Sequence, residues 1–273
     1  MVTVGAIVQA RLGSERLPKK ALLPLPFSGG PTLLQHVVTR AKAAQCITTV
    51  AVATTKRPAD DAIHTFCQDK QIDFFRGSED DVLERFYTSA QKYELDVVVR
   101  LTGDNPFITP ATIDEAVTQH VAAGADYTIT EGLPLGTNIE VVSFSALERA
   151  ANEATEAADR EHVTPYIRRE QGFERQTITC ISALSSLRLT VDYPSDYALA
   201  NLLYAKLYHQ DKLFSFADIE KLLQEHGWLA NVNTQNQQRQ AFASEADEFE
   251  SAAKALKEGG YTRVLQKLEG VRR

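Results

Sequence analysis

Short apolar runs alternate with helix-like segments through the first 125 residues of the chain. The runs lie at residues 4–8, 49–54, 72–75 and 96–101. Runs of this kind are typical of strands that are covered on both faces. Segments with apolar residues at helical spacing follow them, over residues 33–41, 59–70, 82–90 and 109–123. Repeated strand–helix units predict an α/β fold, with a mostly parallel central sheet and helices on both of its faces.

The pattern changes after residue 124. Four more strands are predicted, over residues 126–130, 138–144, 176–182 and 187–191. Helices are predicted at 145–152 and 161–170, and the chain reads as helical from residue 197 onward. We therefore expect a smaller β-containing insertion, followed by a helical C-terminus.

The last forty residues differ in composition from the rest. Residues 231–240 are polar and rich in amides, which is typical of a linker, and an amphipathic charged helix is predicted over 243–257. The predicted division is a main domain over 1–235 and a helical extension over 236–273. Trp228 is expected in the hydrophobic core rather than stacked on a base.

Composition narrows the class of protein. The 273 residues include 29 Lys and Arg against 36 Asp and Glu, for a formal net charge of −7. An acidic balance argues against a nucleic-acid binder, and no apolar run approaches the roughly 18 residues that cross a bilayer. The three cysteines form no C-x-x-C pair, which excludes a disulfide framework and disfavours structural zinc. The N-terminus lacks the features of a secretion signal, so we expect a cytoplasmic protein without a membrane partner.

A basic loop follows the first predicted strand, at the end of the strand where open α/β sheets bind ligands. Its cations are Arg11, Arg16, Lys19 and Lys20. Gly13 and Ser14 add a flexible backbone and a hydroxyl. Arginine and lysine side chains of this kind bind phosphate oxygens, although a solvated basic loop is the alternative. The G-x-x-x-x-G-K-[ST] and G-x-G-x-x-G motifs are absent, which disfavours P-loop NTPases and NAD-dependent dehydrogenases.

Two aspartates come directly after apolar strands. Asp104 follows the strand at 96–101, and Asp192 follows the one predicted at 187–191. Each aspartate alone is either a metal ligand or a turn cap. Magnesium commonly takes one or two carboxylates together with phosphate oxygens and waters. Two carboxylates at strand ends, facing a basic loop, predict a cradle for a metal ion and a triphosphate.

Five long motifs resemble one family of enzymes. They are Ala10-Arg11-x-Gly13-Ser14-x-Arg16-Leu17-Pro18-x-Lys20 and the segments at 76–86, 99–106, 160–167 and 189–196. They resemble the CMP-sugar synthetases, which include CMP-KDO and CMP-sialate synthetases, and in particular the cytidylyltransferases of spore-coat polysaccharide synthesis. The resemblance runs from about residue 3 to residue 235. It implies a nucleotide-diphospho-sugar transferase-like fold over the main domain.

The resemblance also implies an activity and a set of site residues. The enzyme would use CTP and Mg²⁺ and release pyrophosphate, with Lys20, Arg11, Asp104 and Asp192 as catalytic residues and the two aspartates as metal ligands. The residues that would bind the nucleotide are Ala10, Arg11, Gly13, Ser14, Arg16, Lys20, Thr54, Arg76, Ser78 and Arg100. A homodimer is expected by the same resemblance.

The resemblance does not identify the acceptor substrate, because residues 136–140 lie where members of the family vary with their acceptor. The candidate residues for its pocket are Glu140, Arg160, Glu161 and His162. Glu140 stands among apolar neighbours in a predicted strand, which favours either a function or a buried ion pair. The alternative role for His162 is a structural hydrogen bond at the start of a helix. Arg160 and Glu161 could equally form a surface ion pair that contributes little.

Three functions remain open at this point. The first is transfer of CMP to a sugar acid or related acceptor, for surface polysaccharide or glycoconjugate synthesis. The second keeps the fold but uses a sugar phosphate or another small phosphorylated acceptor. The third is a non-catalytic nucleotide-binding subunit.

Overall fold

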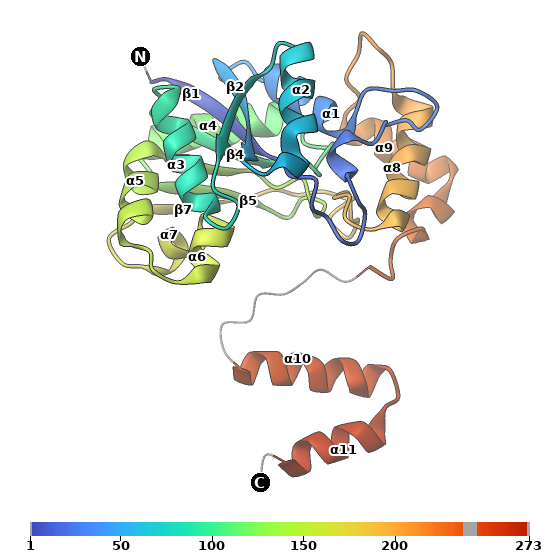
Figure 1. Cartoon of the computed structure of the whole chain (residues 1–273). Coiled ribbons are helices and arrows are strands. Elements are labelled where there is room, and N and C mark those ends of the chain that lie inside the picture. The colour runs from blue at the N-terminus through green and yellow to red at the C-terminus, as the bar shows by residue number, and fades with distance from the viewer. Residues whose placement is uncertain (1, 237–244, 272–273) are drawn as a thin grey trace. The chain divides into compact units, whose positions relative to one another are not determined.

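The computed structural model describes residues 2–236 and 245–271. Contacts divide the chain after Asn236 into two compact units. The first unit holds all of the strands and most of the helices (Figure 1). None of the described helices is long and apolar enough to cross a membrane.

The first unit is built on a single seven-stranded sheet. Its strands are β1 (Val4–Gln9), β2 (Thr49–Thr55), β3 (Asp73–Gly77), β4 (Val97–Thr102), β5 (Tyr127–Glu131), β6 (Glu140–Ser143) and β7 (Arg175–Thr179). The strand order is β3-β2-β1-β4-β6-β5-β7. Only β6 runs antiparallel to its neighbours, β4 and β5, while the other pairs are parallel. The expectation of a mostly parallel sheet is confirmed, and the strands of the predicted insertion extend that same sheet.

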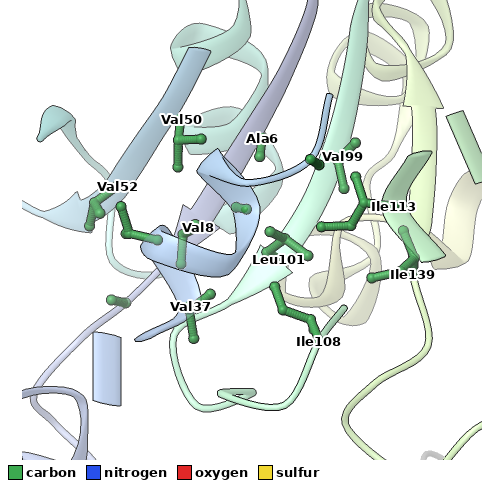
Figure 2. Close-up of a cluster of buried hydrophobic side chains, with 14 of the residues drawn as sticks. Ala6, Val8, Val37, Val50, Val52, Val99, Leu101, Ile108, Ile113 and Ile139 are labelled. Carbon is green, nitrogen blue, oxygen red and sulfur yellow. The ribbon is translucent and has the colours of Figure 1, made fainter. Parts of the chain in front are cut away.

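Helices cover both faces of the sheet, as the sequence predicts. The first face is covered by α1 (Leu33–Lys42), α2 (Asp61–Asp69) and α4 (Pro110–Ala123). Alternate strand residues such as Val8, Val52 and Leu101 point to this face and pack with Val37 and Ile113 (Figure 2). The second face is covered by α3 (Val82–Lys92), α5 (Phe144–Glu153), α6 (Ala157–His162) and α7 (Pro165–Arg169).

A third apolar cluster lies beside the carboxyl ends of the strands. It is built from α8 (Pro194–Leu207), α9 (Phe216–Glu225) and the short 3-10 helix η3 (Gly227–Asn231). Leu25, Leu33 and Phe107 contribute from the N-terminal half of the chain. The remaining 3-10 helices are η1 (Lys20–Leu22) and η2 (Pro58–Asp60). The cluster therefore attaches the C-terminal helices of this unit to the loops that follow β1 and β4.

Three local predictions are wrong. Residues 187–191 form no strand, because the amides of Leu189, Thr190 and Val191 bond to carbonyls of loop residues rather than to a strand. The predicted helix at 161–170 is divided at Val163, which has a φ of 73°, and Pro165 then begins a new helix. Trp228 is 59% exposed, because its neighbour Leu229 fills the core instead.

The second unit contains two helices where the sequence predicts one. They are α10 (Glu245–Glu258) and α11 (Thr262–Val271), and they contact each other. Gly260, with a φ of 74°, lies in the turn between them and adopts the left-handed conformation that glycine tolerates best. Residues 237–244, which include the end of the predicted linker and the start of the predicted helix, lie outside the described residues.

Candidate active site

The loops after β1 and β4 meet because these parallel strands are neighbours in the sheet. Gln9 and Thr102, their last residues, stand side by side in the register. The amide of Gly103 then donates to the carbonyl of Gln9 at 2.8 Å. A Cβ at Gly103 would stand only 3.1 Å from the Cβ of Ala10, so glycine suits this close approach. Asp104 is thereby placed next to the basic loop.

Residues 187–192 reach the same edge by a different route. Leu135 accepts hydrogen bonds from the amides of Leu189 and Thr190, at 2.9 and 3.0 Å. The amide of Val191 donates to the carbonyl of Asp104 at 2.9 Å. The next residue, Asp192, is consequently held beside Asp104, although 88 positions (192 − 104) separate the two aspartates in the sequence.

The basic loop folds back on its own start. The amide of Lys19 donates to the carbonyl of Leu12 at 3.4 Å, and the amide of Leu12 donates to Asp60 at 2.7 Å. Lys19 has a φ of 56°, a turn that leads into η1 at Lys20. This turn places the Lys20 side chain at the edge of the sheet.

Lys20, Asp104 and Asp192 form the centre of the site. The Lys20 Nζ lies 2.6 Å from Asp104 Oδ2 and 2.5 Å from Asp192 Oδ1. The Thr102 hydroxyl donates to the other oxygen of Asp104 at 2.6 Å. The structure thus brings together the basic loop and the two aspartates that the sequence assigns to one cradle.

Electrostatics in this cluster favour the charged forms. Burial alone would lower the pKa of Lys20, but the attraction of Asp104 and Asp192 outweighs it and raises the pKa. Burial would likewise raise the pKa of Asp104, yet the positive charge of Lys20 lowers it. Lys20 is therefore an ammonium ion that bridges two carboxylates at neutral pH.

Two arginines also contact Asp192. Arg16 lies 3.2 Å from its Oδ2 and donates to the hydroxyl of Tyr193 at 3.3 Å. Arg188 lies 3.5 Å from the same oxygen and is 9% exposed. Sequence reasoning missed Arg188, although an arginine between Leu187 and Leu189 is a signal of a buried ion pair. We call Lys20, Asp104, Asp192 and Arg16 the Lys20 cluster.

The other residues of the basic loop surround this cluster. Arg11 and Gly13 are exposed, Ala10 is buried, and Ser14 accepts a hydrogen bond from the Leu17 amide at 3.4 Å. Among the described residues, Arg11 makes no ion pair or hydrogen bond through its guanidinium. That side chain is therefore available to a bound anion.

Arg76, Ser78 and Thr54 lie at the ends of β2 and β3 and make other contacts. Arg76 bonds to the carbonyls of Thr55 and Arg57, and pairs with Asp61 at 2.7 Å. The Ser78 hydroxyl accepts from the Asp81 amide, and the hydroxyl of Thr54 is buried without a partner. In the described part of the chain, no hydrogen bond joins these three side chains to the Lys20 cluster.

Arg100 and Glu140 form a second ionic cluster, which the strand register creates. The two residues are direct partners across β4 and β6, and the Arg100 guanidinium donates to Glu140. The Tyr127 hydroxyl donates to the other carboxylate oxygen at 2.5 Å, and the Thr164 hydroxyl does so at 2.8 Å. We call these four residues the Arg100 cluster.

Glu140 is the acceptor of every bond in the Arg100 cluster. Burial would raise the pKa of Glu140, but Arg100 and the two hydroxyl donors lower it. The Nε of Arg100 is buried and has no partner. Tyr127 and Thr164 were not expected at the site, because nothing in their local sequence shows that they meet Glu140.

The remaining acceptor candidates are not joined to Glu140. Arg160 donates through its Nε to Asp81 at 2.8 Å and through NH1 to the Ala151 carbonyl at 2.6 Å. It therefore ties α6 to the start of α3. Glu161 and His162 are exposed. Within the described residues, none of the three forms a hydrogen bond or ion pair with Glu140.

Taken together, the fold and the site define a class of protein. A mostly parallel sheet with a basic loop after its first strand, and carboxylates at the same edge, provides a site for an anionic ligand at the carboxyl ends of the strands. The profile of the cytidylyltransferase family matches residues 5–250. The chain belongs to the cytidylyltransferase family and is an enzyme of that class.

Relatives in sequence agree with this assignment. The chain is 36% identical to an uncharacterised protein of Methanocaldococcus jannaschii, over 85% of this chain and 95% of that protein. It is 36% identical to the spore coat polysaccharide biosynthesis protein SpsF of Bacillus subtilis, over 73% of this chain and 85% of that protein. A 3-deoxy-manno-octulosonate cytidylyltransferase of Geobacter metallireducens is 32% identical, over 44% of this chain and 45% of its own. The resemblance to the CMP-sugar synthetases is confirmed.

Solved structures share the fold. A cytidylyltransferase from Leptospira borgpetersenii aligns over 88% of this chain and 100% of its own, with a TM-score of 0.78 and 28% identity. A CMP-KDO synthetase solved with CTP aligns over 75% and 99%, with a TM-score of 0.59 and 17% identity. A Mycobacterium tuberculosis protein solved with manganese aligns over 74% and 99%, with a TM-score of 0.54 and 15% identity. The last two likenesses concern the fold alone.

Proposed function

We propose that the enzyme transfers CMP from CTP to a sugar acid or a related acceptor and releases pyrophosphate, in the synthesis of surface polysaccharide or glycoconjugates. The observation that carries the proposal is the single ammonium of Lys20 placed between Asp104 and Asp192, beside the basic loop. The names of relatives from spore coat polysaccharide and octulosonate metabolism support the class of acceptor.

In the proposed reaction, an acceptor oxygen attacks the α-phosphorus of CTP. A new oxygen–phosphorus bond forms while the bond from the α-phosphorus to the bridging oxygen breaks, and pyrophosphate leaves with that electron pair. Negative charge grows on the phosphate oxygens, so cations fixed nearby lower the barrier. Lys20, Arg11 and Arg16 are the cations that this chain presents for that purpose, with Ser14 and the Gly13 backbone beside them.

Asp104 and Asp192 fit a divalent cation. One oxygen of each lies within hydrogen-bond distance of the same Lys20 nitrogen, so a single ion can reach both carboxylates. Two carboxylates suit Mg²⁺, whose other ligands are usually phosphate oxygens and waters. When bound, Mg²⁺ would neutralise charge on the phosphates. Lys20 bonds to these same oxygens, so it must leave them and transfer to the triphosphate.

The Arg100 cluster is the proposed floor of the acceptor pocket. Glu140 and Arg100 cancel each other's charge, while Tyr127 and Thr164 place hydroxyl groups around them. This paired set suits recognition of the hydroxyl groups of the acceptor, while the cations of the basic loop remain for its charge. Thr54, Arg76, Ser78 and Arg100 remain proposed nucleotide residues, although Arg100 also pairs with Glu140. Arg160, Glu161 and His162 remain proposed acceptor residues.

Pyrophosphate release, measured with a coupled phosphate assay, tests the proposal. A thermal-shift screen with Mg²⁺ first ranks CTP, UTP, ATP and GTP. The nucleotide that stabilises the protein most is then combined with sugar acids and, separately, with sugar phosphates. We expect CTP to rank first and a sugar acid to release pyrophosphate.

The same assay distinguishes the alternatives. Release with a sugar phosphate alone would assign the second acceptor class, whose phosphate nucleophile needs no general base. Tight CTP binding without turnover for any acceptor would support a non-catalytic subunit.

We also propose that the enzyme is a cytoplasmic homodimer, for which light scattering should give about twice the mass of the 30.2 kDa chain.

A further inference from the structure

The carboxylate of Asp196 lies beneath the loop that carries Asp192. Its Oδ2 accepts the backbone amides of Asp192 and Tyr193, each at 3.0 Å. The Nε of Arg188 donates to both carboxylate oxygens, at 3.0 and 3.1 Å. The side chain is 0% exposed, and a buried carboxylate needs such donors to replace water. Asp196 therefore fixes the backbone from which the Asp192 side chain projects.

Two asparagines complete this set of donors. The Nδ2 atoms of Asn233 and Asn236 lie 2.9 and 2.6 Å from Asp196 Oδ1. Asn233 is 3% exposed and also donates to the carbonyl of Arg188 at 2.9 Å. The Ser195 hydroxyl donates to the side-chain Oδ1 of Asn236 at 3.0 Å. These asparagines lie in the segment predicted as a linker, yet they are bonded to the back of the Asp192 loop.

The two oxygens of Asp196 have different partners. Oδ2 holds the amides of Asp192 and Tyr193, whereas the asparagines bond only to Oδ1. Bonds at Oδ1 set the plane of the carboxylate and so keep Oδ2 aligned with the two amides. Asn236 is the outermost of these donors and is only partly buried, so it can be removed without opening a core cavity.

We propose that Asn236 and Asn233 are positioning residues for Asp192 and that they act through Asp196. They keep the Asp192 carboxylate beside Lys20 and Asp104, in the place where the metal–triphosphate complex is proposed to bind. Only the statement that a metal–triphosphate complex binds at this place rests on the proposed function. Residues that orient a metal ligand in this way commonly change metal affinity by about tenfold or more when removed.

Asn236→Ala is the test, with Thr234→Ala as the matched control. Thr234 is exposed in the same segment, and among the described residues its hydroxyl bonds only to the Asn231 carbonyl. Two quantities are measured on the full chain. They are hydrogen exchange at the amides of residues 188–197, and the affinity of the CTP-bound enzyme for Mn²⁺ by electron paramagnetic resonance.

In Asn236→Ala we expect faster exchange at Asp192 and Tyr193, and Mn²⁺ binding weaker by about tenfold. The melting temperature should stay near that of the wild type, and Thr234→Ala should match the wild type in both readouts. Asn236→Asp places a second carboxylate against Asp196 and should weaken Mn²⁺ binding at least as much. If the alanine variant is poorly folded, hydrogen exchange and Mn²⁺ affinity in Asn236→Asp test the proposal instead.

Wild-type exchange rates and Mn²⁺ affinity in folded Asn236→Ala would overturn the proposal. A failure of the proposed function gives a different result, because the wild type and Thr234→Ala would then not bind Mn²⁺ with CTP. Exchange at the Asp192 and Tyr193 amides is measured without ligand. It therefore decides whether Asn236 holds this loop in either case.

Discussion

The Lys20 cluster and the Arg100 cluster are both half-buried ion pairs at the same edge of one sheet, but they are built differently. Asp104 and Asp192 come from a turn and a loop, and Lys20 begins the short 3-10 helix η1. Arg100 and Glu140 are register partners on adjacent strands, and Tyr127 reaches Glu140 through its hydroxyl from the next strand. Strands hold their partners in place through the backbone ladder, whereas loops can rearrange at lower cost. We therefore expect the first cluster to exchange its cation more readily than the second.

Asp192→Asn, which alters the Lys20 cluster, should have the largest effect on activity. The amide keeps the size of the side chain but loses the charge that would hold the metal–triphosphate complex. We expect pyrophosphate release at saturating Mg²⁺ to fall by about 10²- to 10³-fold. Steady-state kinetics measure this, and unchanged turnover would remove Asp192 from the mechanism. Asp69→Asn, a change at an exposed aspartate far from the cluster in sequence, is the control.

Glu140→Gln should show that the Arg100 cluster stabilises the folded protein. Leaving Arg100 without its charged partner should lower the free energy of unfolding by about 3 kcal/mol, measured by urea denaturation. The pKa of Glu140 is lowered in the folded state, so its contribution is complete above the usual carboxyl pKa of 4.5 and is lost as pH falls below that. The stability difference between the variant and the wild type should therefore shrink below about pH 4. A difference independent of pH would contradict this account.

Lys20→Gln should change metal binding in the absence of nucleotide. Without Lys20, no cation among the described residues lies between Asp104 and Asp192, so free Mn²⁺ should bind about tenfold more tightly than to the wild type, by titration with paramagnetic detection. Lys19→Gln removes the same charge from an exposed neighbour and should have little effect. Equal affinities in the two variants would mean that Lys20 and the metal do not compete.

Glu161→Ala and His162→Ala should have the smallest effects. Both side chains are exposed, so the free energy of unfolding should change by no more than about 0.5 kcal/mol. If they contact the acceptor, its KM should rise severalfold while the KM for CTP stays constant. An unchanged KM for the acceptor would confine its recognition to the Arg100 cluster.

The sequence predicts the sheet, and it predicts the meeting of the basic loop with Asp104 for one physical reason. Parallel strands end at a common edge, so residues that follow them meet there whatever their separation along the chain. Asp192 reaches the same edge from a loop, so its place was predicted from a strand that does not form. Arg188, Tyr127 and Asn236 could not be found in this way. Each meets its partner through a loop contact, an antiparallel strand pair or the segment that follows η3, and none of these follows from local periodicity. Trp228 was misplaced because hydrophobicity alone does not say which of two adjacent apolar residues enters the core.

The reversed direction of β6 has an evolutionary consequence. A strand that runs opposite to β4 begins where β4 ends, so Glu140 arrives at the ligand edge from a stretch of chain that contributes nothing to the basic loop. Sequence changes around Glu140 and Tyr127 can therefore alter the proposed acceptor pocket while the residues of the basic loop stay the same.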